Sequence, residues 1–137
     1  ANGNKVKSTD FKGKKHVIYF YPKDFTPGCS TQADEFSTDY KKFQNKDIEI
    51  IGISPDDVDS HKKFCEKMGI KYVLLADTEK EVSKAFDVWS MKKFMGREYM
   101  GVVRSTFLVN EKGKIFKIYS KVKAKGHAKQ VLEDFTK

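Results

Sequence analysis

Cys29 is the residue whose neighbours in the sequence most favour chemistry. Thr26 is a preferred N-cap and Pro27 suits the first helical position, so the sequence predicts a helix that carries Cys29 in its first turn. Backbone N–H groups there have no acceptor within the helix, and the helix dipole is positive at this end. Both features favour the thiolate, which is the nucleophilic form of cysteine. The alternative is that Cys29 is a small, inert core residue.

The other residues with reactive or metal-binding side chains are widely spaced. Cys65 lies 36 positions after Cys29 (65 − 29), which excludes a Cys-x-x-Cys redox motif and a cysteine-based zinc site of usual spacing. The three histidines, His16, His61 and His127, belong to no metal-ligand pattern, so we expect no metal. The simplest interpretation of His61 is a partly buried residue of a helix.

A buried strand precedes Cys29. The apolar run Val17–Tyr21 is typical of a strand with both faces covered, in the interior of a parallel sheet. Pro22 ends this strand because it has no N–H to donate. The residues that follow then form a loop that turns into the helix of Cys29.

The rest of the chain predicts alternating strands and helices. Apolar spacing favours one helix from Pro27 to about Phe43, and Thr78 with Glu81 has the form of a capping box. The other expected elements are strands at 5–8, 48–53, 72–76, 102–109 and 114–119, helices at 55–68, 78–86 and 127–135, and a loop or hairpin at 92–101. This order predicts an α/β fold in one domain, residues 1–137, with a mixed sheet covered on both faces.

Composition narrows the class of protein. The sequence is 39% hydrophobic and 34% charged, and no apolar run is long enough to span a membrane or to serve as a signal peptide. The net charge of +8 fits either a nucleic-acid binder or a solvated basic surface. No stripe of Lys and Arg alternates with aromatic residues, so we expect the solvated surface, no specific nucleic-acid partner and no membrane partner.

The segment YPKDFTPGCSTQA resembles the peroxidatic signature of peroxiredoxins, in particular the PrxQ or bacterioferritin-comigratory branch. Similarity continues through 50–56, 86–89 and 94–115, so it covers nearly the whole chain. It implies a thioredoxin-like fold of the glutathione-peroxidase-like type, with a central mixed sheet flanked by helices. It also implies a thiol-dependent peroxidase that reduces hydrogen peroxide and organic hydroperoxides without a cofactor. Relatives usually carry a further stretch with short strands before residue 1, so the chain is either trimmed or covers this edge differently.

The resemblance implies a role for each residue of the site. Cys29 would become a sulfenic acid, and Arg104, expected inside a strand, would lie beside its sulfur and hold the polarised O–O bond. The alternative for Arg104 is an outward-facing strand residue. Thr26 would orient thiolate and peroxide, Pro22 would limit solvent, and the N–H groups of Gly28 and Cys29 would complete an oxyanion site. Three aromatic residues are either pocket walls or plain core: Phe25, Trp89 and Phe94.

The sulfenic acid must then be recycled. Many family members place the resolving cysteine five residues after the first, but that position here is Asp34. A smaller group carries it on the next helix, where Cys65 fits. A disulfide needs Cα atoms within about 7 Å, so we expect local unwinding at Cys29 and around Cys65. The alternative is an inert Cys65 in a one-cysteine peroxidase.

The resemblance further implies thioredoxin or a similar dithiol protein as reductant and a monomeric enzyme in the cytoplasm, with nuclear or organellar placement left open. Hypotheses from other classes are a redox-inactive thioredoxin-like binding module and a basic nucleic-acid binder with an incidental thiol. Both leave the set Pro22, Thr26, Cys29 and Arg104 unexplained.

Overall fold

The first described strand, β1 (Lys15–Phe20), carries apolar side chains on both faces. Val17 and Tyr19 lie on one face, and Ile18 and Phe20 lie on the other. Such a strand belongs in the interior of a covered sheet, as the sequence predicts. The structure is a computed structural model that describes residues 13–94, 96–120, 122 and 126–135.

After β1 the chain alternates helices and strands. The elements are α1 (Pro27–Thr38), α2 (Tyr40–Asn45), β2 (Ile48–Ser54), α3 (Val58–Met68), β3 (Val73–Ala76), α4 (Glu81–Ala85), β4 (Trp89–Phe94), β5 (Arg97–Val102), β6 (Ser105–Val109), β7 (Ile115–Ser120) and α5 (His127–Phe135). The strand expected at 5–8 lies outside the described residues. Within the described ranges, no helix combines the length and the apolar character needed to cross a bilayer.

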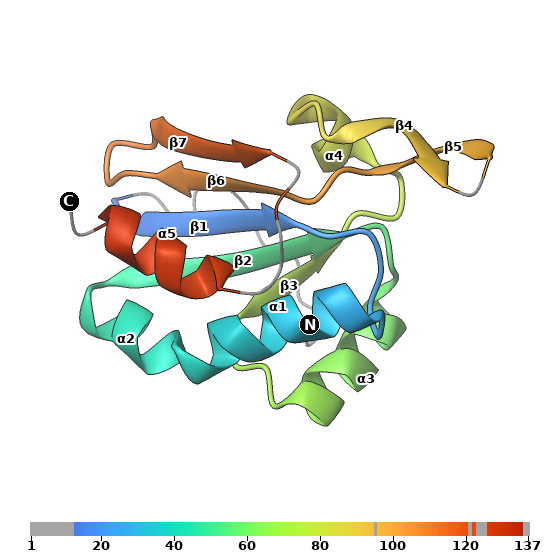
Figure 1. Ribbon diagram of the computed structural model, residues 1–137. Helices are drawn as coiled ribbons and strands as arrows, with labels where there is room; N and C mark the ends of the chain where they lie inside the picture. Colours follow the sequence, from blue (N-terminus) through green and yellow to red (C-terminus); the bar gives the residue numbers. More distant parts are fainter. Residues whose placement is uncertain (1–12, 95, 121, 123–125, 136–137) are drawn as a thin grey trace.

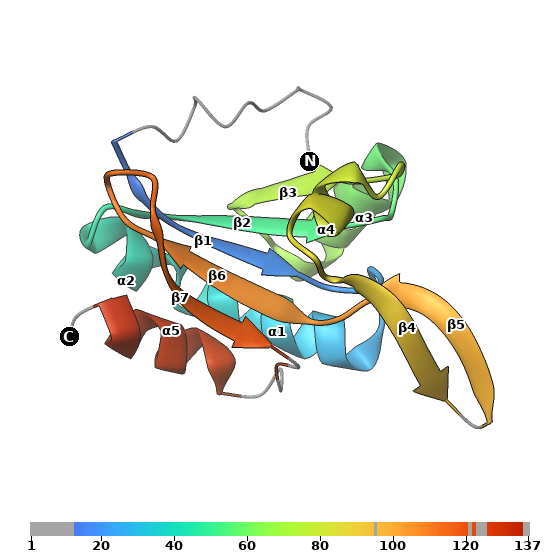
Figure 2. The same ribbon diagram turned by 90° about the horizontal axis from the view of Figure 1, so that it is seen from above.

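The main sheet is mixed, with strand order β3-β2-β1-β6-β7 (Figure 1). The strands β1, β2 and β3 run parallel, whereas β6 is antiparallel to β1 and β7 is antiparallel to β6. In this register Ile18 of β1 lies between Ile51 of β2 and Phe107 of β6. The strands β4 and β5 form a separate hairpin that extends away from the sheet (Figure 2). The predicted mixed sheet flanked by helices is confirmed.

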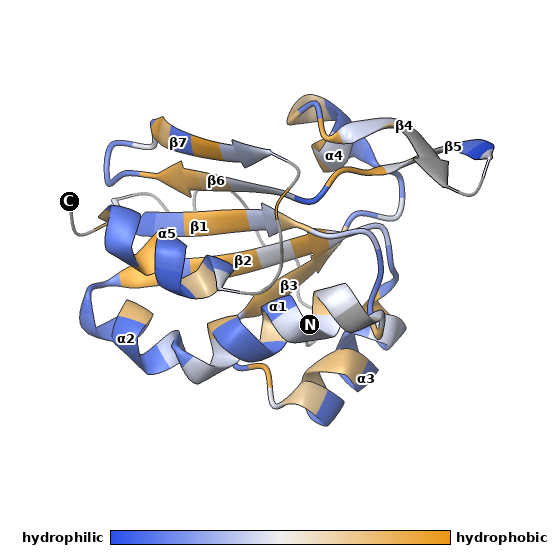
Figure 3. Cartoon of the chain, in the orientation of Figure 1, coloured by the Kyte–Doolittle hydropathy of each residue, from blue (hydrophilic) through white to orange (hydrophobic). Residues whose placement is uncertain are grey.

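Two apolar clusters cover the two faces of the sheet. Side chains of α1, α2, α3 and α5 pack on one face, around the buried residues Tyr19, Phe36, Phe64, Leu108 and Val131. The segment after α4 packs on the other face, with Phe86 against Phe20 and Phe107. Figure 3 shows the largely hydrophobic central strands between helices that mix hydrophilic and hydrophobic residues. Cys29 belongs to the first cluster.

The helix predicted from Pro27 to Phe43 is wrong in one respect, because the chain breaks it at Asp39. Asp39 has φ −91° and ψ 2°, and it separates α1 from α2. Its backbone carbonyl accepts hydrogen bonds from Lys42 and Phe43, which starts the new helix. Phe36 and Phe43 still pack against each other, with ring centroids 5.9 Å apart, so the apolar spacing alone does not reveal the break.

The capping box predicted from Thr78 and Glu81 is also wrong. The N-cap of α4 is Lys80, whose backbone is left-handed with φ 59°. The side chain of Asp77 accepts hydrogen bonds from the N–H groups of Val82 and Ser83, at 3.1 and 2.8 Å. The Asp77 side chain, and not that of Thr78, therefore accepts hydrogen bonds from the N–H groups in the first turn of α4.

Candidate active site

The first turn of α1 has the geometry that the sequence predicts. Thr26 is the N-cap with extended backbone angles (φ −79°, ψ 151°), and Pro27 is the first helical residue. The helix begins with the hydrogen bond from Ser30 N–H to the Thr26 carbonyl, at 2.8 Å. The N–H groups of Gly28 and Cys29 precede this bond, so they have no acceptor within the helix. Cys29 is buried, with 2% of its surface exposed.

Arg104 contacts the sulfur of Cys29, with Nη2 3.1 Å from Sγ. The residue does not lie inside a strand, as expected, but between β5, which ends at Val102, and β6, which starts at Ser105. Its backbone carbonyl accepts a hydrogen bond from the N–H of Val122, which follows β7. A positive charge at this distance stabilises a thiolate.

Two further residues hold the guanidinium in place. Gln32 is buried on α1, and its Oε1 accepts a hydrogen bond from Nη1 of Arg104 at 2.5 Å. Gly28 leaves the necessary room, since a Cβ atom there would lie 3.1 Å from Nη2 of Arg104. Gln32 was not among the site residues predicted from the sequence. Its position three residues after Cys29 places both side chains on one helix face, which is the signal that would have found it.

Thr26 and Pro22 lie in the loop before α1. The Thr26 hydroxyl donates to the carbonyl of Lys23 at 2.8 Å and does not cap the helix with its side chain. Its oxygen keeps lone pairs that can accept a hydrogen bond from a bound ligand. Pro22 is half-buried and lies two positions after the last residue of β1, which ends at Phe20, one residue earlier than the predicted strand.

Cys65 lies on α3 and packs at the margin of the first cluster. Cys29 and Cys65 are both free thiols. Burial raises the pKa of the Cys65 thiol, and the nearby carboxylates of Asp24 and Glu66 raise it further. Cys65 is therefore protonated at neutral pH and less nucleophilic than an exposed cysteine.

The hydrogen bonds of His61 to Asp24 and to the carbonyl of Leu75 were not predicted from the sequence. His61 is fully buried, not partly, and it bonds to Asp24 in the loop before α1. Of the three aromatic candidates for the pocket wall, Phe25 is 44% exposed and Trp89 packs at the margin of the second cluster. The side chain of Phe94 lies outside the described part of the chain. Among the described residues, no three His, Cys, Asp or Glu side chains gather as they would around a metal ion.

Comparison with known proteins gives a consistent result. Residues 1–118 match the AhpC/TSA family. Peroxiredoxin Bcp of Bacillus subtilis is 48% identical over 132 residues, which are 96% of this chain and 84% of that protein. A putative peroxiredoxin bcp of Helicobacter pylori strain J99 is 40% identical over 97% of this chain and 88% of its own length.

Solved structures agree with the sequence comparison. A structure of Xanthomonas campestris bacterioferritin comigratory protein, described for its alkyl peroxide reduction activity, superimposes with a TM-score of 0.94 at 37% identity. It covers 98% of this chain and 84% of its own. Two variants of Xanthomonas campestris peroxiredoxin Q, each with one cysteine changed to serine, have TM-scores of 0.91 and 0.93 at 37% identity. They cover 96% and 98% of this chain and 83% and 86% of their own.

Proposed function

The chain belongs to the AhpC/TSA family and is a thiol-dependent peroxidase of the peroxiredoxin class, and we propose that Cys29 is the residue that attacks the peroxide. The contact between Arg104 Nη2 and Cys29 Sγ carries this assignment. Cys65 has no such cation in the described structure, and nearby carboxylates raise its pKa. Of the two thiols, only Cys29 has surroundings suited to a nucleophile at neutral pH.

In the first step the Cys29 thiolate attacks one oxygen of the hydroperoxide. An S–O bond forms and the O–O bond breaks, so the cysteine is oxidised to sulfenic acid and the peroxide is reduced. The other oxygen leaves with the electron pair of the O–O bond and takes up a proton to become water or an alcohol. This second oxygen develops negative charge as the bond breaks, so hydrogen-bond donors aimed at it lower the barrier.

The residues around the sulfur can supply those interactions. The guanidinium of Arg104 donates to sulfur in the resting state and can share its N–H groups with the reacting oxygen. The N–H groups of Gly28 and Cys29 lie ahead of the first helical bond and add backbone donors. The hydroxyl of Thr26 already donates to Lys23, so it would accept the remaining O–H of the peroxide and orient it. Pro22 would limit water at the sulfur.

In the second step Cys65 resolves the sulfenic acid. Its thiol sulfur attacks the sulfur of Cys29, the S–O bond breaks, and a disulfide and one water form. The spacing of the two cysteines supports this assignment, because the two substituted cysteines of Xanthomonas campestris peroxiredoxin Q are also 36 positions apart (84 − 48). Both cysteines here lie within formed helices, so we propose that local unwinding at Cys29 and around Cys65 precedes the disulfide.

A thiol reductant restores the enzyme, and we propose thioredoxin or a similar dithiol protein for this role. Two thiols of the reductant become a disulfide as Cys29 and Cys65 are reduced. A cycle that depends on free thiols suits the cytoplasm or another reducing compartment. The monomeric state and the absence of a specific nucleic-acid partner stay predictions.

The test is intact mass and thiol count after one equivalent of hydrogen peroxide, for the wild-type protein and for Cys29→Ser and Cys65→Ser. We expect rapid loss of both thiols to an intramolecular disulfide, which Cys29→Ser abolishes. Cys65→Ser is expected to stop at a sulfenic acid on Cys29. If the wild-type protein also stopped there with Cys65 free, the one-cysteine alternative would be correct. Oxidation no faster than that of an exposed cysteine would overturn the assignment of Cys29.

A further inference from the structure

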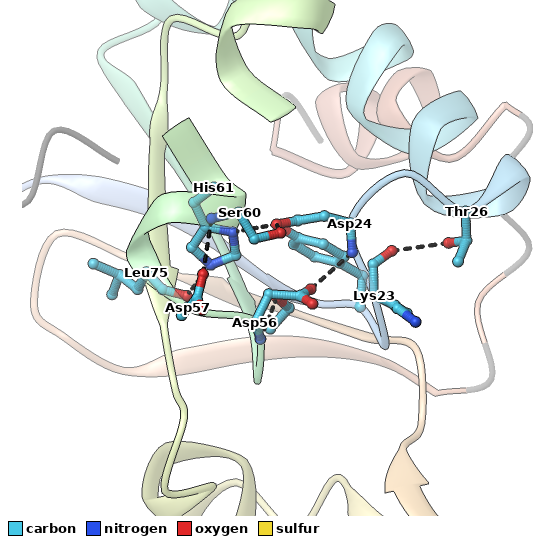
Figure 4. A network of polar contacts seen from close by, with 10 residues as sticks. Lys23, Asp24, Thr26, Asp56, Asp57, Ser60, His61 and Leu75 are labelled. Atoms are coloured by element: carbon cyan, nitrogen blue, oxygen red, sulfur yellow. Dashed lines mark hydrogen bonds and ion pairs between the residues drawn. The ribbon is translucent and has the colours of Figure 1, made fainter. Parts of the chain in front are cut away.

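A buried polar cluster joins the loop before α1 to helix α3 (Figure 4). At its centre is the carboxylate of Asp24, which is only 3% exposed. Its Oδ1 accepts from the hydroxyl of Tyr21 at 2.6 Å. Its Oδ2 lies 2.8 Å from the Ser60 hydroxyl and 2.7 Å from Nδ1 of His61. A loop residue is thus bonded to two residues on one face of α3.

The hydrogen bonds fix the charges of this pair. Nε2 of His61 lies 3.0 Å from the carbonyl of Leu75, and a carbonyl only accepts, so Nε2 carries a proton. Nδ1 faces a carboxylate that already accepts from Tyr21 and Ser60, so Nδ1 donates as well. Burial raises the pKa of Asp24, but the bonds from His61, Tyr21 and Ser60 outweigh it and hold this pKa below its ordinary value. Asp24 and His61 therefore form a buried ion pair in which both partners are fully bonded.

The next residue of the loop makes a second contact with α3. Phe25 has a left-handed backbone, with φ 66°, which is unfavourable for a bulky side chain. Its ring packs edge-on against Phe64, with centroids 5.1 Å apart, and Nζ of Lys67 lies 5.7 Å above it. A conformation of this kind persists only where the surrounding contacts maintain it. Contacts with α3 therefore set the backbone that leads into Thr26.

The backbone of the loop is held as well. The N–H of Asp24 donates to the Asp56 carboxylate at 2.7 Å, and the same oxygen accepts from the Ser54 hydroxyl at 2.8 Å. Asp56 lies just before α3, so the side chain and the backbone of Asp24 are both fixed by the segment that begins this helix. Thr26, the N-cap of α1, lies two positions after Asp24, and Cys29 lies five positions after it. The position of the reacting sulfur thus depends on the contacts between the loop and α3.

The same helix carries Cys65, four positions after His61 and directly after Phe64. Side chains four residues apart share a face, so His61 and Cys65 leave α3 in the same direction. The charge of Asp24 also raises the pKa of the Cys65 thiol. Unwinding this part of α3, as disulfide formation requires, would pull His61 and Phe64 away from the loop.

We propose that Asp24 and His61 are positioning residues that fasten the loop before α1 to α3 while Cys29 reacts with peroxide, and that their ion pair opens before Cys65 reaches Cys29. This inference rests on the proposed function. The pair favours the first chemical step, because it holds Thr26 and the first turn of α1 in place. It opposes the second step, because it holds the helix of Cys65 in its folded form. Weakening the pair therefore changes the two steps in opposite directions.

The test separates the two steps in time. Reduced protein is mixed with hydrogen peroxide, quenched at millisecond intervals and analysed by intact mass. The sulfenic acid appears with a rate constant that scales with peroxide concentration, and the disulfide follows with one that does not. The variants are His61→Gln and the milder Ser60→Ala, which removes one hydrogen bond to Asp24. The matched control is Ser83→Ala, which removes a hydroxyl bonded to the buried Asp77 on the other face of the sheet.

A typical hydrogen bond shifts a conformational equilibrium by about twofold to tenfold. We expect Ser60→Ala to slow sulfenic acid formation and to speed disulfide formation, each by several-fold and up to about tenfold. His61→Gln is expected to act in the same directions and more strongly, and Ser83→Ala to change neither step by more than about twofold. The proposal would be overturned if both rate constants, for sulfenic acid formation and for disulfide formation, fell in Ser60→Ala. It would also be overturned if both stayed unchanged in this variant while the protein remained folded.

The wild-type trace separates this proposal from the proposed function. A wild-type protein that forms sulfenic acid but no disulfide would overturn the resolving role of Cys65 and, with it, the opening step. The rate constant of sulfenic acid formation in Ser60→Ala would still show whether Asp24 and His61 position the loop before Cys29. A wild-type Cys29 that reacts no faster than an exposed thiol would instead overturn the proposed function itself.

Discussion

Arg104 and Cys29 are 75 positions apart in the sequence, and the guanidinium Nη2 of the first lies 3.1 Å from the sulfur of the second. The arginine approaches from the break between β5 and β6, and the cysteine lies in the first turn of α1. Gln32 and Gly28, both on α1, fix how closely the guanidinium approaches. This contact and its neighbours lead to the following predictions.

Replacing Arg104 by lysine should slow the reaction of Cys29 with peroxide by about 10- to 100-fold, the effect of losing a hydrogen bond to a charged group. Lysine keeps the charge, but it cannot bond the sulfur and Gln32 with two nitrogens in one plane. The measurement is the second-order rate constant for hydrogen peroxide. Arg97→Lys, on the exposed part of β5, is the matched control and should leave this constant unchanged. Equal rates for the two variants would exclude Arg104 from the first step.

Gly28→Ala should reduce the rate of Cys29 oxidation by about threefold to tenfold without lowering stability. The new Cβ would lie 3.1 Å from Nη2 of Arg104 and would push the guanidinium away from the sulfur. Alanine is a better helix former than glycine by roughly 1 kcal/mol, so the helix itself gains. The rate constant and the urea unfolding curve are measured together, with Ser30→Ala as the control in the same turn. A rate equal to wild type would mean that Arg104 adjusts without loss.

Gln32→Glu should stabilise the fold and slow the first step. The Nε2 atom of Gln32 is buried and has no hydrogen-bond partner among the described residues, which costs about 1–3 kcal/mol. A carboxylate removes this unpaired donor and pairs with Arg104, but it also draws the positive charge away from the sulfur. Urea unfolding and the peroxide rate constant test the two effects.

Gln32→Met is the matched variant, because it keeps the volume and removes both polar atoms. Gln32→Met should slow the first step, because Arg104 loses the acceptor for Nη1. It should not gain the ion pair with Arg104 that is expected for Gln32→Glu. If Gln32→Glu and Gln32→Met both reacted as fast as wild type, Gln32 would not position the arginine.

In the Cys29→Ser variant, Cys65 should react slowly with iodoacetamide at neutral pH, and the rate should rise with a midpoint above the ordinary thiol pKa of 9.0. Burial raises this pKa first, and the charges of Asp24 and Glu66 add to it. Removing one charge with Glu66→Gln should move the midpoint back toward 9.0. The pH dependence of alkylation, followed by mass, gives both midpoints. A midpoint below 9.0 would contradict the expected surroundings of Cys65.

Stability should fall as the pH falls from 7 to 5 because of His127. Burial lowers the pKa of His127, the hydrogen bond that its ring donates to Gln130 opposes this, and the charge of Arg104 lowers the pKa further. The unfolded chain then binds a proton near pH 6.5 that the folded chain does not yet bind, so stability decreases below that pH. The slope from one such group is at most about 1.4 kcal/mol per pH unit.

His127→Gln should remove this part of the slope, whereas His16→Gln, at a half-buried position of β1, should keep it. The measurement is the free energy of unfolding in urea at pH 7, 6 and 5 for the three proteins. The prediction fails if wild type and His127→Gln lose the same stability between pH 7 and 5.

Local patterns were sufficient to predict the backbone around Cys29. Thr26 and Pro27 mark the helix start through their own conformational preferences, and Gly69, which follows the predicted helix 55–68, ends α3 with a left-handed φ of 66°. The apolar run of β1 likewise identified a central strand. These features depend on neighbouring residues, which a sequence displays directly.

The features that sequence patterns did not predict depend on distant partners. Asp24 and His61 are each unremarkable in sequence, and only the packing of α3 on the loop brings them within 2.7 Å. Asp39 breaks a helix whose apolar spacing continues across the break. Arg104 lies in the break between β5 and β6, and the strand predicted at 102–109 runs across this break because no local signal marks it.

The separation of Arg104 from Cys29 also concerns folding. The contact exists only once β6 has paired with β1, and β1 is the strand that leads into the loop and α1. Contacts between distant segments form late, because the intervening chain must first be closed into a loop. A nascent or partly folded chain therefore carries Cys29 without its cation, as an ordinary thiol. Fast oxidation of Cys29 during refolding would thus report when the native topology is complete.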